Sequence, residues 1–120
     1  MSANKTGAGN SVQYSNTGTA ISSGDVVIVG DLVGIAETDI AATTGVGTVA
    51  IEGVYTVACD SADVIKVGQS LVWDASADKF VDTNTPATGD NTGGVVAMTA
   101  AGTGVVFLDV KLCPGAGSTT

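Results

Sequence analysis

The alternation of apolar and polar residues predicts short β-strands along most of the chain. Residues 26–29 form an unbroken β-branched run, Val-Val-Ile-Val, with a Gly-Asp pair on each side. β-Branched side chains suit a pleated sheet, and Gly and Asp favour tight turns, so this run predicts a strand bounded by bends. A second strand is predicted at residues 32–36. Because both faces of the first strand are apolar, we expect it to be covered on both sides.

A period of two recurs later in the chain. Residues 46–57 alternate between an apolar and a partly polar face, and Gly53 within them predicts a bulge or bend. Strands are also predicted at residues 95–99 and 105–112. In the last strand the predicted core face carries Val106, Leu108, Val110 and Leu112.

The middle of the chain predicts a hairpin that holds the single Trp. Residues 69–74 and 79–81 have strand character and are separated by an Asp-rich turn, which brings Trp73 close to Phe80. We therefore expect these two rings to pack together. Just before the hairpin, residues 60–66 are predicted to form one capped helical turn.

The polar stretches divide the chain into three parts. Residues 1–19 are small, polar and Gly-rich, which predicts a flexible N-terminal arm. Residues 20–113 are predicted to form a single β domain, interrupted by an exposed loop at residues 82–94. Residues 114–120 are predicted to form a C-terminal tail that ends strand pairing.

A weak internal repeat supports a fold built from two related β units. Three segments recur in order: residues 24–29 as 68–73, residues 33–36 as 94–97, and residues 47–57 as 104–112. The predicted fold class is therefore all-β, a small Gly-rich β-barrel or sandwich of short strands.

Composition limits the size of the core and the class of partner. The chain has 120 residues, of which 44% are hydrophobic, 4% aromatic and 17 Gly, so one domain with a modest aliphatic core is expected. Twelve acidic residues against four Lys give a net charge of −8, which repels nucleic acid and anionic membranes. No apolar run matches a signal peptide or a membrane span, so a soluble protein made in the cytoplasm is expected.

The residue types required for common catalytic and metal sites are missing. The chain has no His and no Arg, so neither a Ser-His-Asp triad nor a His-containing metal site is possible. The closest carboxylate pairs are Asp60 with Asp63 and Asp74 with Asp78, and neither fits a calcium-binding loop. We therefore expect no catalytic residue, no cofactor and no metal. The two cysteines, Cys59 and Cys113, are expected to be reduced in an unsecreted protein, although the sequence leaves their pairing open.

Several segments together resemble a known family. Residues 23–27, 32–36, 52–55, 67–74, 94–97 and 106–112 are similar, in this order, to the capsid cement or head decoration proteins of tailed bacteriophages. The resemblance covers most of residues 22–112. Members of that family are small β domains on the outside of icosahedral heads, and they carry no catalytic residues.

The resemblance implies a structural role in the virion. It implies a homotrimer, made in the host cytoplasm, that binds the major capsid protein over capsomer junctions on the outer surface and braces the shell. Trimeric binding to repeated sites gains avidity. We expect the capsid contact to lie on the arm at Val12, Gln13, Tyr14 and Ser15, where a strand can be added to a partner. Residues 82–94 are a second exposed candidate.

Two other classes of function remain open at this point. A carbohydrate-binding or adhesion module of a phage or cell surface is also a small acidic β domain, but it usually exposes aromatic rings, and here the few aromatics fall mostly on core-facing positions. An enzyme would have to use carboxylates, Lys and hydroxyls alone.

Overall fold

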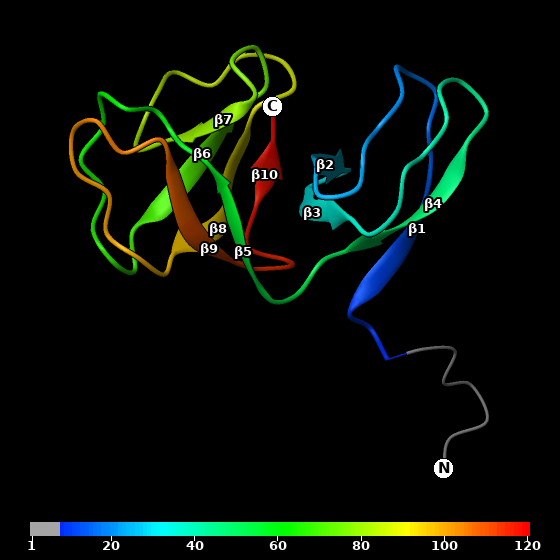
Figure 1. The fold of residues 1–120 in the computed structure, drawn as a ribbon, viewed down its shortest axis with the longest axis horizontal. Helices are drawn as coiled ribbons and strands as arrows, with labels where there is room; N and C mark the ends of the chain where they lie inside the picture. Colours follow the sequence, from blue (N-terminus) through cyan, green and yellow to red (C-terminus); the bar gives the residue numbers. More distant parts are fainter. Residues whose placement is uncertain (1–7) are drawn as a thin grey trace.

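A computed structural model describes residues 8–120 and builds them from β-strands without a helix (Figure 1). The strands are β1 (Ser11–Ser15), β2 (Val26–Val29), β3 (Leu32–Ala36), β4 (Val46–Ala50), β5 (Val54–Ala58), β6 (Ser70–Asp74), β7 (Lys79–Val81), β8 (Asn91–Ala97), β9 (Phe107–Leu112) and β10 (Ser118–Thr119). The all-β prediction is confirmed. Residues 1–7 of the predicted arm lie outside the described residues.

The strands form two antiparallel sheets that lie beside each other (Figure 1). The first sheet has the order β1-β4-β3-β2, and the second has the order β5-β9-β8-β6-β7, with β10 paired to β8. Among residues 8–120 neither sheet closes into a barrel. In the second sheet, one isolated parallel bridge joins Phe80 of β7 to Cys59, which follows β5.

The apolar strand β2 is covered on both faces, as its sequence predicted. Val27 lies in a buried cluster with Ala36, Ile40 and Val49, inside the first sheet. The alternate side chains, Val26 and Ile28, pack against the larger core of the second sheet. β2 therefore contributes to both cores and joins the two sheets.

The second sheet holds the larger core. Its buried members include Ile65, Leu71, Val95, Leu108, Val110 and Leu112. The rings of Trp73 and Phe80 are also buried in it, with centroids 4.9 Å apart in an edge-to-face arrangement, which confirms the predicted pairing.

The two sheets repeat the same backbone hydrogen bonds. The N–H of Gly24 donates to the carbonyl of Ala36 at 2.8 Å, and the N–H of Gly68 donates to the carbonyl of Ala97 at 2.7 Å. Just before each glycine, an isolated antiparallel bridge occurs, Ile21 with Ile40 and Ile65 with Ala101. The predicted repeat is therefore confirmed for its first two segments.

The third predicted segment, residues 47–57 as 104–112, holds only for β4 and β9, and the repeat also includes β1 and β5, which were not aligned from the sequence. β1 pairs with β4 as β5 pairs with β9, over five residue pairs each, and β3 contacts β4 as β8 contacts β9. We call β1–β4 the first repeat, and β5, β6, β8 and β9 the second repeat. The hairpin strand β7 is inserted between β6 and β8 of the second repeat and has no equivalent in the first.

The predicted strand at residues 46–57 is wrong as a single strand. It divides into β4 and β5, which belong to different sheets. Gly53 lies between them with φ of 114°, a conformation that L side chains rarely adopt. The predicted bend at Gly53 is thus the point where the chain leaves one repeat and enters the other.

Four other element predictions are corrected. Residues 60–66 form no helical turn; Asp60 instead accepts the N–H of Ala62 at 3.0 Å, in a short turn too brief to nucleate a helix. The last long strand begins at Phe107, and Val106 is 51% exposed. The polar loop ends at Asp90, because Asn91 already belongs to β8. Finally, the tail does not end pairing, since β10 lies against β8.

Hydrogen bonds of the buried Asn91 and of Thr119, near the C-terminus, join the two repeats. Asn91 donates from Nδ2 to the carbonyl of Asp31 and to Oγ1 of Thr119, both at 3.0 Å. Thr119 in turn donates from Oγ1 to the carbonyl of Gly30 at 2.7 Å. The turn between β2 and β3 is therefore bonded to β8 and β10. The division into an arm, one β domain and a tail stays a prediction, although strands are present in all three parts.

Candidate functional site

The four residues predicted to contact a partner form most of β1, at one end of the first sheet. Val12 and Tyr14 turn inward and are half-buried against the cluster around Val49, whereas Gln13 and Ser15 are exposed. β1 pairs with β4 on one side, and within residues 8–120 no strand pairs with its other side. The backbone of β1 is thus available for strand addition, as the sequence prediction required.

A hollow of about 320 Å³ opens beside β1. It is lined on one side by Tyr14 and the following loop through Ile21, and on the other side by residues 26–28 of β2. We call this hollow the slot. The slot thus lies between β2 and the loop that follows β1, and β1 and β2 are the two end strands of the first sheet.

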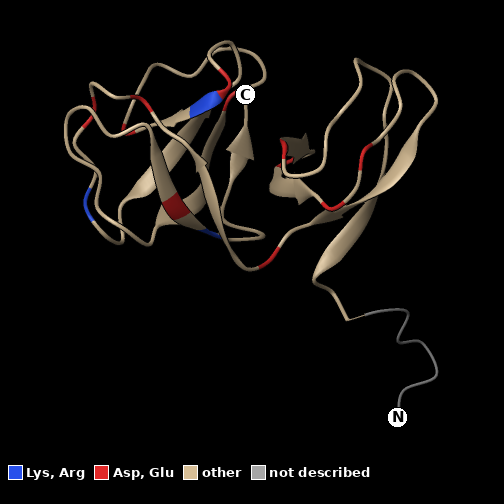
Figure 2. Ribbon diagram, in the orientation of Figure 1, with Lys and Arg blue, Asp and Glu red and all other residues tan. Residues whose placement is uncertain are grey.

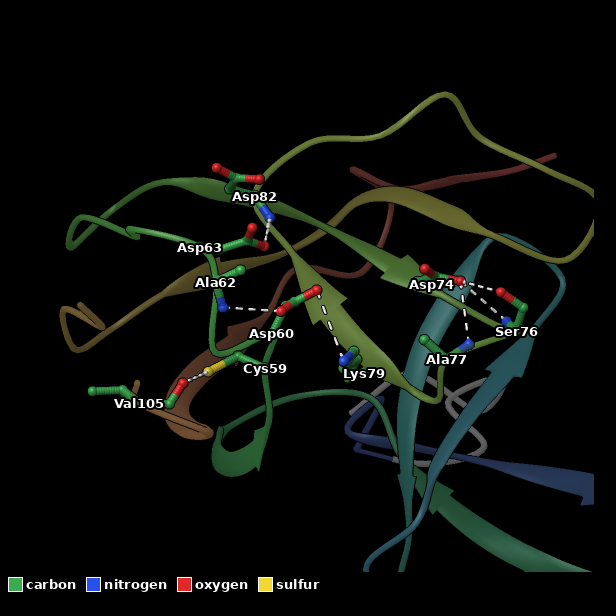
Figure 3. Close-up of polar contacts among 10 residues, drawn as sticks. All are labelled: Cys59, Asp60, Ala62, Asp63, Asp74, Ser76, Ala77, Lys79, Asp82 and Val105. Carbon is green, nitrogen blue, oxygen red and sulfur yellow. Dashed lines mark hydrogen bonds and ion pairs between the residues drawn. The ribbon is translucent and has the colours of Figure 1, made fainter. Parts of the chain in front are cut away.

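The corresponding space of the second repeat is occupied by β7. Phe80 is only 1% exposed, and its carbonyl accepts the N–H of Asp60 at 3.0 Å. Figure 3 shows the surrounding polar contacts: Asp63 accepts the N–H of Asp82 at 2.9 Å, and Lys79 lies 3.8 Å from the Asp60 carboxylate. The two repeats therefore differ most where the candidate contact lies.

The second predicted contact, residues 82–94, is only partly a surface loop. Residues 85–88 are exposed, but Asp90 is buried and its carboxylate accepts the N–H groups of Ala75 and Ala87 at 3.0 Å each. These bonds, first that of Ala87, hold the pKa of Asp90 below its usual value because they favour the ionised form. This carboxylate organises the loop and is not displayed to a partner.

One exposed apolar segment was missed by sequence reasoning. Val105, Val106 and Phe107 are 39%, 51% and 61% exposed. Three consecutive apolar residues cannot all face one core across a pleated strand, and that run was the signal available in the sequence. Such a segment on a protein surface is typical of a contact with another protein.

Acidic residues are distributed over both repeats, but basic residues are not (Figure 2). The first repeat, from residue 10 to residue 51, holds Asp25, Asp31, Glu37 and Asp39 and has no Lys or Arg. The face presented by this repeat is therefore negative, and a partner with basic residues fits it best.

The described residues show no arrangement typical of a metal or thiol site. Within residues 8–120 no group of three or more carboxylates and thiols is placed to hold a metal ion. Both cysteines are free, and Cys59 is buried. Burial, followed by the nearby carboxylates of Asp63 and Asp60, raises the pKa of the Cys59 thiol, which disfavours the reactive thiolate. No helix in the described part is long and apolar enough to cross a membrane.

Comparison with known proteins gives one family. The family model described as phage cement protein matches residues 6–112, which include all strands of both repeats. A comparison with curated proteins returns no match. Since the family model covers most of the chain, from before β1 to the end of β9, the protein belongs to the phage cement proteins, a structural family of the virion capsid.

Proposed function

We propose that this protein binds the outer surface of the phage head at the junctions between capsomers and stabilises the assembled shell. The observation that carries the proposal is the family match over residues 6–112. The negative surface, with a net charge of −8, favours contact with protein rather than with packaged DNA. In this role the protein acts mechanically, without turnover of a substrate.

The proposed contact with the major capsid protein is the free side of β1, at Val12, Gln13, Tyr14 and Ser15. Strand addition supplies backbone hydrogen bonds whatever the side chains, and the alternation of half-buried and exposed positions along β1 supplies register. The protein is proposed to act as a homotrimer, because three linked weak contacts on a symmetric lattice hold far longer than one.

Purified virions test the proposal directly. Particles from the wild-type phage and from a phage lacking the gene are compared by mass spectrometry and by electron microscopy. We expect knobs over capsomer junctions on the outer surface of wild-type particles alone. We also expect the deletion phage to release its DNA at a lower temperature than the wild type. Absence of the protein from wild-type virions, or equal heat resistance of the two particles, contradicts the proposal.

A further inference from the structure

The first repeat lacks a strand that the second repeat possesses. In the second repeat the chain leaves β6, turns and returns as β7, which pairs with β6 over residues 79–81 and reaches Cys59 through the parallel bridge. In the first repeat the chain passes from β2 through the tight turn at Gly30 and Asp31 directly into β3. The space that β7 fills in one repeat therefore stays open in the other, and this space is the slot.

The strand β7 shows what the missing strand contributes. Its middle residue, Phe80, inserts a ring into the core beside Trp73, and the neighbouring Val81 is also buried. Its first residue, Lys79, stays partly exposed beside the carboxylate of Asp60. The space thus takes an extended segment with one large apolar side chain pointing inward and a basic residue at the rim.

The slot of the first repeat retains features that β7 satisfies in the second. Tyr14 and Ile21, which line the slot, are only partly buried around the small core. Asn16 and Cys59 are both buried, and their N–H groups donate equivalent backbone bonds, to the carbonyls of Gly45 and Val106. The residues that follow them, Thr17 and Asp60, are therefore equivalent positions of the two repeats. The N–H of Asp60 is bonded to Phe80, whereas that of Thr17 has no partner among residues 8–120. Apolar surface and a backbone donor therefore remain for an added strand.

We propose that the slot binds an extended segment of the major capsid protein, which completes the first repeat as β7 completes the second. The proposal rests on the capsid-binding function proposed above and names the way in which the partner is held. Charge favours this occupant over a second copy of the chain. The first repeat carries four carboxylates and no base, and the whole chain is acidic, so a basic capsid segment is attracted where another copy is repelled.

A matched pair of substitutions distinguishes the slot from the rest of the surface. Thr19 lines the slot and is exposed, so Thr19→Trp places an indole where the added strand has to lie. Ala62 is exposed in the corresponding loop of the second repeat, where β7 already fills the space, so Ala62→Trp is the control. Neither side chain belongs to a core cluster, and we expect both variants to unfold at the temperature of the wild type.

Binding is measured by co-sedimentation of each protein with capsids purified from the phage that lacks the gene. We expect Thr19→Trp to weaken binding at least tenfold and Ala62→Trp to bind as the wild type does. If both variants bind these capsids with the affinity of the wild type, the slot is not the contact. Failure of the wild type to bind these capsids contradicts the proposed function itself, so the two failures are distinct.

Covalent capture identifies the occupant. A photoreactive amino acid at Thr19 is irradiated on the capsid, and the adduct is mapped by mass spectrometry, with the same group at Ala62 as the control. We expect an adduct with one extended, base-containing segment of the major capsid protein, formed from Thr19 alone. An adduct with residues of another cement protein copy overturns the proposed occupant, and equal adducts from both positions overturn the specificity of the slot.

Discussion

At the scale of single residues, one turn of the first repeat holds a Thr in a left-handed backbone conformation, where the equivalent turn of the second repeat has Gly. Thr43 has φ of 64°, and its N–H donates to the carbonyl of Gly18 at 3.0 Å. The equivalent bond of the second repeat runs from Gly104, with φ of 91°, to Ser61 at 2.7 Å. A left-handed backbone suits Gly and disfavours a β-branched residue, so Thr43 stands where the fold favours Gly.

Replacing Thr43 by Gly is expected to stabilise the protein. Relief of left-handed strain, about 1–3 kcal/mol, exceeds the entropic cost of Gly, about 0.5–1 kcal/mol, which leaves a gain of about 1 kcal/mol in the free energy of unfolding. Urea denaturation measures the gain. Thr44→Gly, at a neighbouring residue without positive φ, is expected to lower stability, and a loss in Thr43→Gly would show that the strain is absent.

Asp90 makes stability depend on pH in a defined direction. Its folded-state pKa is lowered, so its contribution is present above the pKa of an unfolded Asp, about 3.9, and is lost as pH falls through the folded value. Asp90→Asn removes an acceptor from the N–H groups of Ala75 and Ala87. We expect the stability difference between wild type and variant to be constant near neutral pH and to shrink in acid. The matched control is Glu52→Gln, at an exposed residue, and an equal pH profile for both variants contradicts the role of Asp90.

At the scale of elements, strands with β-branched or aromatic residues were predicted from the sequence, whereas β10 and the first half of β8, which consist of polar and small residues, were not. β2, β3, β6 and β7 were predicted because β-branched and aromatic residues are concentrated in them. The first half of β8 was missed because Asn91 and two glycines are typical of a loop. Only the folded chain supplies hydrogen-bond partners for the side-chain amide of Asn91, which allow this residue to be buried in a strand. β1 was anticipated only as a strand formed on a partner, whereas β4 of the same chain pairs with it.

The contact between β3 and β8 shows why the repeat is weak in sequence. Val33 and Gly94 are equivalent positions of the two repeats, and the side chain of Val33 lies where a Cβ on Gly94 would be. Two identical side chains would collide at this pseudo-symmetric contact. Divergence at this position is therefore required by packing, and it weakens the sequence likeness of residues 33–36 and 94–97.

We expect Gly94→Ala to lower the free energy of unfolding by about 1–3 kcal/mol, the usual cost of overpacking a filled core. The added methyl group meets Val33 and the amide of Asn91, so Val33→Ala in the same chain is expected to recover part of the loss. Chemical denaturation of the single and double variants gives the coupling. Gly102→Ala is the control, because its Cβ would meet no atom within 4 Å; equal losses for the two glycines would place the effect outside the contact.

At the scale of the whole molecule, the sequence predicted an all-β fold with two related units, but the way they are joined required tertiary structure. Residues 12–15, the predicted contact, lie on a strand that pairs within the chain, and the slot beside it was not foreseen. A slot is defined by a strand that is missing, and only comparison with β7 of the second repeat reveals it. The C-terminal residues were likewise predicted to be free because Gly, Ser and Thr carry no apolar signal.

Those C-terminal residues are expected to hold the two repeats in one cooperative unit. Thr119→Val preserves the shape of the side chain but removes the hydroxyl that donates to Gly30 and accepts from Asn91. Loss of these bonds at a buried amide is expected to cost about 1–3 kcal/mol. Because the bond from Thr119 to Gly30 reaches the first repeat, we also expect faster hydrogen exchange in β2 and β3 than in β8 and β9. The control is Thr120→Val, since the contacts of Thr120 are made by its backbone. Acceleration of exchange confined to β8 and β9 would mean that Thr119 stabilises the second sheet alone and does not join it to the first.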